Sequence, residues 1–278
     1  MRRRDRVFVA VSLTALVGTL AFVALAGWLL WRESLQAEEE RVAALASRLG
    51  KRTEGIILET RDTLASLNAD VSDPCTASHR KAMGMAAFDA AHVLAIGYWR
   101  AAERLCGAGF IEAIELKPSK ADRIYDSGLI AWWPGPQTRV GATELFLMRL
   151  GRHDVAIDPR RLLPATSAAG RTIGLWVEGL PMATVPEDAS LPELEDVAQG
   201  LRVDRRAGRL VARFSLDTVL PIDIVVSEGI GSFWQRQRLP AAALVAGVVL
   251  LFGGWSYGVL QYTRRRFSLA GELRDALD

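Results

Sequence analysis

The chain has 278 residues, of which 50% are hydrophobic and 24% are charged, and its formal net charge at pH 7 is +2. Residues 33–238 hold 25 Lys+Arg against 28 Asp+Glu, so the basic excess belongs to the two ends of the chain. A domain without net basic charge argues against nucleic-acid binding, and we expect no nucleic-acid partner.

Two long runs without a charged residue, 7–31 and 239–262, predict membrane-spanning helices. A bilayer core of about 30 Å needs roughly 20 helical residues, and the first run exceeds the apolar core of a cleaved signal peptide. Arginines at positions 2, 3, 4 and 6 and at 264–266 predict that both termini are cytoplasmic. The pattern predicts a multi-pass protein of a bacterial inner membrane, in contact with its lipid. Its segments are a tail (1–6), a span (7–31), a periplasmic domain (32–238), a span (239–262) and a cytoplasmic stub (263–278).

The first span is expected to continue as a helix through 32–70. Leu35, Val42, Leu49 and Ile56 recur at period seven, with Leu45 beside them. Such a stripe packs either against a copy of itself or against the helix's own domain. We favour the second arrangement, since glycines 50 and 55 weaken a continuous coiled coil.

The rest of the periplasmic segment alternates turn signals with short apolar runs. Residues 76–91 predict a helix, and 92–100 with 105–113 predict an antiparallel hairpin. Further strands are expected at 128–133, 172–179, 201–216 and 222–227, a turn into a helix at 155–163, and a capped helix at 191–201. The predicted fold class is α+β, with two transmembrane helices flanking a mixed helix and antiparallel-sheet sensor domain. A PAS- or Cache-like topology is compatible with it by analogy.

The chain has two cysteines, Cys75 and Cys106, separated by 31 positions in the predicted exported domain. An even pair on the oxidising side of a membrane favours a disulfide. Two independent buried thiols are the plain alternative. A metal site is a third, because Cys75 and His79 are spaced i, i+4 and Cys106 with His92 would complete four ligands, but no paired C-x-x-C spacing supports it.

The second apolar run contains a small-residue spacing, Gly254 and Gly258 in a G-x-x-x-G pattern, preceded by Ala243 and Gly247. Such spacings allow close helix packing, and they also occur by chance in apolar helices. We expect a transmembrane dimer contact at Gly254 and Gly258, and therefore a homodimer.

No established nucleophile, phosphate-binding or metalloprotease motif occurs in the chain. Trp132 and Trp133, before Pro134 and Pro136, are interpreted as core and turn packing rather than as a ligand pocket. We expect no catalysis by this chain as given, no cofactor and no metal.

The overall plan resembles the CSS-motif sensor domain that precedes EAL-type cyclic-di-GMP phosphodiesterases. The matching stretches are CTASHRKAMGMAAFDAAHVLAIGYWRAAERLCGAG, VAIDPRRLL, IDIVVSEGIGSFW and the tail RRRFSLAGELRDALD. The motif itself is half present, because Gly107 and Ala108 stand where the family has two serines after the second cysteine. The EAL domain is absent from this chain.

The resemblance implies a redox or envelope-stress sensor that regulates a cyclic-di-GMP phosphodiesterase. In such a protein, a thiol–disulfide pair of Cys75 and Cys106 is the switch and a periplasmic thiol–disulfide oxidoreductase is a partner. Two alternatives stay open: a small-ligand-binding input domain of another receptor class, and a membrane interaction protein without enzymatic output.

Overall fold

The computed structural model describes residues 3–70, 73–110, 116, 118, 120–187, 189–190, 200–217, 219–231, 242–243, 245–255, 257–258 and 261. The side chains of 3–13, 15–16, 19 and 217 lie outside this description. The chain divides into two compact units, one of Met1–Glu38 with Gly231–Asp278 and the other of Glu39–Ile230. The second unit, which lies within the predicted domain 32–238, contains the sheets and both cysteines.

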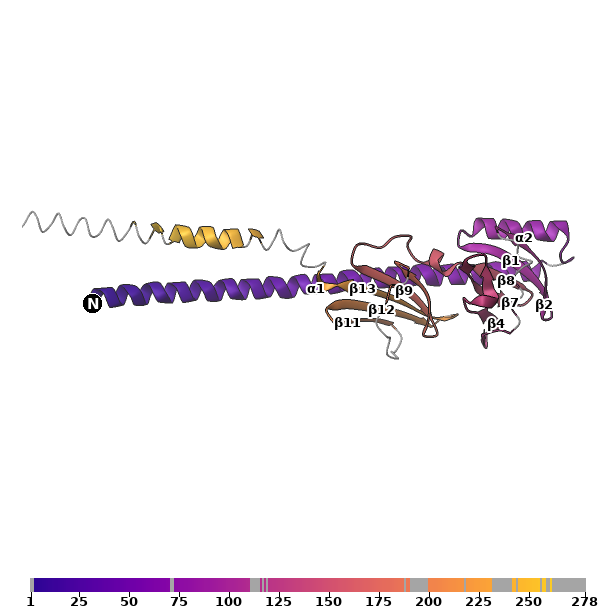
Figure 1. Ribbon diagram of the computed structural model, residues 1–278, viewed down its shortest axis with the longest axis horizontal. Coiled ribbons are helices and arrows are strands. Elements are labelled where there is room, and N and C mark those ends of the chain that lie inside the picture. Colours follow the sequence, from indigo (N-terminus) through magenta and orange to yellow (C-terminus); the bar gives the residue numbers. More distant parts are fainter. Residues whose placement is uncertain are drawn as a thin grey trace, which may run out of the picture. The chain divides into compact units, whose positions relative to one another are not determined.

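A six-stranded antiparallel sheet forms one part of this second unit (Figure 1). Its strands, in spatial order, are β2 (Glu103–Gly109), β1 (Val93–Arg100), β8 (His153–Ile157), β7 (Phe146–Leu150), β4 (Leu129–Trp132) and β3 (Arg123–Ile124). Strand β2 therefore forms one edge of the sheet, and β1 lies between β2 and β8.

A five-stranded antiparallel sheet forms the other part. Its strands, in spatial order, are β10 (Leu180–Val185), β9 (Arg171–Val177), β13 (Pro221–Gly229), β12 (Arg209–Asp217) and β11 (Gly200–Arg206). The smaller elements are a pair of short strands, β5 (Arg139–Val140) and β6 (Thr143–Glu144), and two 3-10 turns, η2 (Pro136–Thr138) and η3 (Pro159–Leu162).

Helix α1 (Arg3–Ala69) passes along both sheets within the second unit (Figure 1). Val42, Leu49 and Leu64 are buried in one core with residues of both sheets. A Cβ at Gly50 would lie 2.1 Å from the Phe214 ring, so this glycine lets β12 approach the helix closely. From Val42 onward, the apolar stripe is therefore docked on its own domain, as the sequence favoured.

A buried carboxylate fastens α1 to the five-stranded sheet. Glu228 on β13 is 2% exposed and accepts hydrogen bonds from Arg41 of α1, at 2.9 and 3.1 Å. Arg171 on β9 donates to the same carboxylate at 2.9 and 3.0 Å. Two guanidinium groups from different elements thus converge on one acid, which fixes the register of the helix against the sheet.

Among the residues that the structure describes, no helix is both long and apolar enough to cross a membrane. The prediction of two transmembrane helices at 7–31 and 239–262 is therefore contradicted, and so is the multi-pass inner-membrane location.

The mixture of helices and antiparallel strands agrees with the predicted α+β content. Helix α2 (Ala77–Asp89) and the β1–β2 hairpin confirm the predictions for 76–91 and for the strands that follow. Strands β4, β9, β11, β12 and β13 were also expected. The stretch 155–163 is instead the end of β8 followed by η3, and the predicted helix at 191–201 falls almost wholly outside the described residues.

Candidate functional site

Cys75 and Cys106 are joined by a disulfide, with an S–S distance of 1.98 Å and a Cα–Cα distance of 5.8 Å. The bond links the residue before the cap of α2 to the edge strand β2. Both cysteines are partly buried and pack against the main core of the second unit. Of the alternatives that the sequence left open, the structure contains the disulfide.

The backbone around Cys75 is set by the start of α2. Thr76 is the N-cap residue, and its hydroxyl accepts a hydrogen bond from the backbone N–H of His79. Cys75 has a φ of 64°, in the left-handed region, which costs an L-residue about 1–2 kcal/mol. Its own N–H donates to Nδ1 of His79 at 3.1 Å. This imidazole therefore reaches back over the helix start, in the manner of a capping side chain.

A β-bulge decides which way Cys106 points. Tyr98 pairs with Cys106, whereas Trp99 pairs with Arg104, so Leu105 is an extra residue in β2. In a regular strand Arg104 and Cys106 would point to the same face. The bulge turns Cys106 toward α2 and Arg104 toward the opposite face of the sheet.

The face of the six-stranded sheet toward the helices gathers aromatic and histidine side chains. Tyr98 pairs across the sheet with Cys106 on one side and with His153 on the other. Its ring centroid lies 5.4 Å from that of His79 on α2 and 5.3 Å from that of His153. The disulfide and both histidines therefore surround a single buried tyrosine.

The two histidines belong to a chain of hydrogen bonds, which we call the histidine relay. It runs from Cys75 through His79 and His153 to Asn68 on α1. Nε2 of His79 lies 3.0 Å from Nε2 of His153, and Nδ1 of His153 lies 2.9 Å from Oδ1 of Asn68. Nδ2 of Asn68 donates to the carbonyl of Leu150 at 2.7 Å. The relay thus connects α2, β8 and the end of α1.

The two ends of the relay fix the direction of every hydrogen bond in it. The backbone N–H of Cys75 can only donate, so Nδ1 of His79 accepts and its Nε2 carries the proton. At the other end, Oδ1 of Asn68 accepts, also from the backbone N–H of Arg152. His153 therefore donates from Nδ1 and accepts at Nε2. Both imidazoles are neutral in this arrangement.

Burial favours the same neutral state. Desolvation lowers the pKa of His79 below its usual value. Desolvation first, and then the nearby His79, lower the pKa of His153 to about 4. An imidazolium in the first turn of α2 would also be opposed by the positive end of the helix dipole.

The opposite face of the same sheet carries a buried ion pair. The guanidinium of Arg104 donates to Oδ1 of Asp154 at 3.0 Å, with only 2% and 1% of the two side chains exposed. Nε1 of Trp99 donates to the same oxygen at 2.9 Å, and Trp99 stacks on Trp132. A Cβ at Gly97 would lie about 2 Å from both charged groups, so this position needs glycine.

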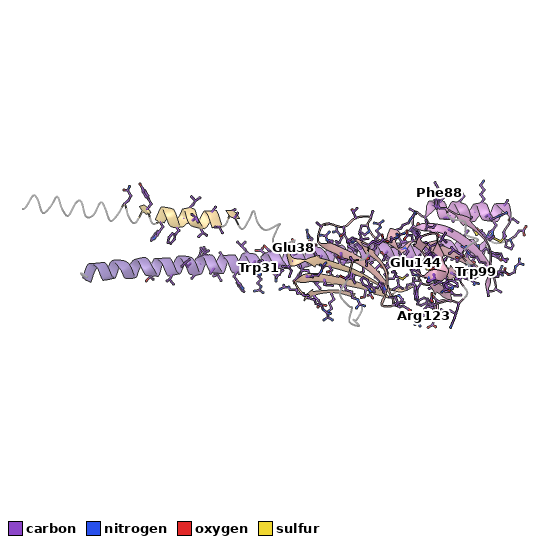
Figure 2. The ribbon with its side chains drawn as sticks, in the orientation of Figure 1. Trp31, Glu38, Phe88, Trp99, Arg123 and Glu144 are labelled. Atoms are coloured by element: carbon purple, nitrogen blue, oxygen red, sulfur yellow. A yellow bond between two sulfur atoms is a disulfide. The ribbon has the colours of Figure 1, made fainter. Side chains whose placement is uncertain are left out.

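Trp132 and Trp133 both lie in packed positions. Trp132 is stacked on Trp99 and Trp133 on Phe146. Figure 2 marks Trp99 within the six-stranded sheet and Phe88 on the exposed side of α2. The interpretation of the two adjacent tryptophans as packing residues agrees with these contacts.

The four residues considered as metal ligands are not all brought together. His92 is hydrogen-bonded to Thr60 of α1 at 2.9 Å, whereas His79 faces His153. In the part of the chain that the structure describes, no cluster of three or more metal-binding side chains occurs. Gly254 and Gly258 are exposed within the first unit, and their dimer contact stays a prediction.

His153, Asn68 and Tyr98 were missed in the sequence. A signal for His153 was present, because His153, Val155 and Ile157 alternate along β8 and share one face with Tyr98 of β1, although all five residues of β8 are buried. Asn68 carries no local signal.

The fold and the site together define an α+β unit of two antiparallel sheets on one long helix, with a disulfide beside a histidine relay. No family model matches the chain, and no curated protein matches it. Its fold is similar to that of a solved structure, an extracellular ligand binding receptor from Desulfohalobium retbaense DSM5692. The TM-score is 0.52 and the identity 10%, over 68% of this chain and 40% of that one. The chain thus covers less than half of the receptor, and the likeness concerns the fold alone.

Proposed function

We propose that this chain is a thiol–disulfide sensor domain whose Cys75–Cys106 bond regulates a cyclic-di-GMP phosphodiesterase, as in the CSS-motif proteins that its sequence resembles. The single observation that carries the proposal is the disulfide itself. It joins the cysteines that the resemblance singles out, although the serines that follow in that family are replaced.

The position of the bond supports a switching role. Cys106 lies on an edge strand, and Cys75 lies in a left-handed backbone conformation just before α2. Reduction removes the covalent link between α2 and β2, and it leaves the N-cap, the relay and the packing of Met83 and Ala87 to hold the helix. A difference in how α2 packs is the kind of two-state element that a signal can bias.

The test uses the full chain joined to the EAL domain it is proposed to regulate. We expect phosphodiesterase activity to change on reduction, and Cys106→Ala to lock the activity at its reduced level whatever the redox state. Hydrolysis of cyclic-di-GMP is measured with thiol state followed by alkylation and mass spectrometry. Leu105→Ala, at the neighbouring exposed bulge, is the matched control and should keep the redox response.

The same experiment defines failure. If both cysteines are alkylated fully without reductant under oxidising growth, or if activity ignores both reductant and Cys106→Ala, the proposal is overturned.

A thiol–disulfide oxidoreductase is the proposed partner that sets the redox state, because disulfide exchange requires a thiolate donor.

A second candidate function is small-ligand binding, which the similar fold in an extracellular ligand binding receptor raises. A specific observation favours it: among the described residues, Oδ2 of buried Asp154 and Nε1 of buried Trp132 have no hydrogen-bond partner. If the sheet opens at this point, a bound solute with a donor and an acceptor would satisfy both atoms. A thermal-shift screen with amines and amino acids tests this. Stabilisation that persists in Cys106→Ala would favour binding over redox sensing.

A further inference from the structure

The histidine relay begins on the backbone of a disulfide cysteine. The N–H of Cys75 donates to His79, and this bond helps hold Cys75 in its unfavourable left-handed conformation. The sulfur of the same residue is bonded to Cys106. A change in the protonation of His79 is therefore transmitted directly to one half of the disulfide.

Each imidazole can take a second proton only where a hydrogen bond now exists. A proton on Nδ1 of His79 would face the N–H of Cys75, and a proton on Nε2 of His153 would face the N–H of His79. Two donors would then point at each other. Protonation of either ring thus breaks one link of the relay.

The groups around the relay offset such a charge only in part. Tyr98 faces it from β1 and Asn68 from α1, and neither is a carboxylate that would pair with an imidazolium. On β8, Asp154 favours the protonated form of His153 and Arg152 opposes it. Asp154 points to the opposite face of the sheet, where Arg104 binds it. The disulfide-bonded state therefore favours the relay in which both imidazoles are neutral.

We propose that the histidine relay makes the Cys75–Cys106 switch sensitive to pH, such that acid favours the reduced form. The inference rests on the proposed function, because it concerns regulation of the same disulfide. In the bonded state the relay excludes a second proton from His79 and His153. Once the bond is broken and Cys75 is released, both imidazoles are free to take up protons.

Reduction of the Cys75–Cys106 disulfide requires only a dithiol as co-reactant. A thiolate of the dithiol attacks one sulfur, the S–S bond breaks, and the other sulfur leaves as a thiolate that takes a proton. The second thiol of the reagent then displaces the remaining protein sulfur, which is also protonated. Two electrons pass to the protein, and the dithiol becomes a disulfide. When the thiols of the reagent and of the protein are all protonated, the exchange consumes no net proton. Any change of its equilibrium constant with pH below about 8 therefore reports protons that bind elsewhere in the chain.

The experiment measures the equilibrium constant for reduction of the full chain by dithiothreitol at pH values from 7.5 to 5. Samples approach equilibrium from the oxidised and the reduced sides, and thiols are trapped by alkylation and counted by mass spectrometry. We expect the constant to rise by at least about 30-fold as the pH falls over this range, because one histidine with a usual pKa near 6.5 contributes about 30-fold and two contributions multiply. Histidines with a usual pKa near 6.5 would then bind protons in the reduced form only.

Three variants separate the relay from other causes. His79→Asn keeps an acceptor for the Cys75 N–H but does not titrate, so the rise should be smaller. His79→Asn with His153→Asn should give a constant that is flat within about twofold. His92→Asn is the matched control, because His92 is also buried but bonded to Thr60 outside the relay, and the wild-type rise should persist.

The outcomes distinguish this inference from the proposed function. A constant that does not change with pH in the wild-type chain, or an equal rise in the double variant, overturns the inference while leaving redox control of the output intact. The opposite result is also possible to recognise. If the equilibrium constant rises in acid only when the relay is intact, but phosphodiesterase activity does not respond to reduction, the pH coupling is supported and the proposed control of the phosphodiesterase is overturned.

Discussion

Asp154→Ala is expected to lower the free energy of unfolding by about 3–5 kcal/mol. Removal of this carboxylate leaves the guanidinium of Arg104 buried without its acidic partner. It also removes the acceptor of the Trp99 indole N–H. Both donors have almost no exposed surface, so water cannot replace the lost carboxylate without opening the sheet. Urea denaturation of the oxidised chain, followed by tryptophan fluorescence, measures the loss.

Asp204→Ala is the matched control for this prediction. Asp204 forms an ion pair with Arg202 on the same strand, but 35% and 55% of these side chains are exposed. Exposed pairs contribute about 0–1 kcal/mol, so the control should be nearly neutral. A loss below about 1 kcal/mol for Asp154→Ala as well would contradict the claim that this pair is sealed from solvent.

Glu228→Ala is expected to cost about 3 kcal/mol, near the lower end of the range for breaking a buried ion pair. The carboxylate is bound by Arg41 and Arg171, and its loss leaves two guanidinium groups facing each other at the contact of α1 with the five-stranded sheet. The side chain of Arg41 is 42% exposed and can regain water, which limits the penalty. Chemical denaturation at pH 7 gives the magnitude.

Glu39→Ala provides the comparison for Glu228. Glu39 is also paired with an arginine across the α1 and sheet contact, since Arg205 of β11 donates to it, but this pair is exposed. We expect a loss of less than about 1 kcal/mol. If the two variants are equally destabilised, the effect of Glu228 lies in helix docking in general and not in its buried charge.

The apolar patterns of the sequence predict the elements whose signal is local. The apolar run at 93–100 has the length of a strand and is flanked by turn residues, so the local sequence predicts β1 and its hairpin partner. The even number of cysteines favoured the disulfide over two free thiols or a metal site, and the structure contains the bond. The period of seven residues through Val42 and Leu49 marks the buried side of α1.

The histidine relay could not be predicted because its members are distant in the chain. Asn68, His79 and His153 meet only through the order of strands β2, β1 and β8, and this order is a property of the whole sheet. The Asp158–Pro159 step is typical of a turn into a helix, and it concealed the strand before it. The bulge at Leu105 also lacks a local signal, although it decides that Cys106 points toward the helices.

The disulfide closes a covalent ring of residues 75–106, which contains α2, β1 and the first half of β2. In the sheet these strands are the two outermost at one edge, and all five strands of the other sheet lie outside the ring. Opening of the bond would therefore first increase amide hydrogen exchange in this edge segment, as a subglobal unfolding event, while the five-stranded sheet keeps its protection. A signal that starts at the cysteines would then consist of local unfolding at this edge of the six-stranded sheet. The second unit would not be displaced as a rigid body.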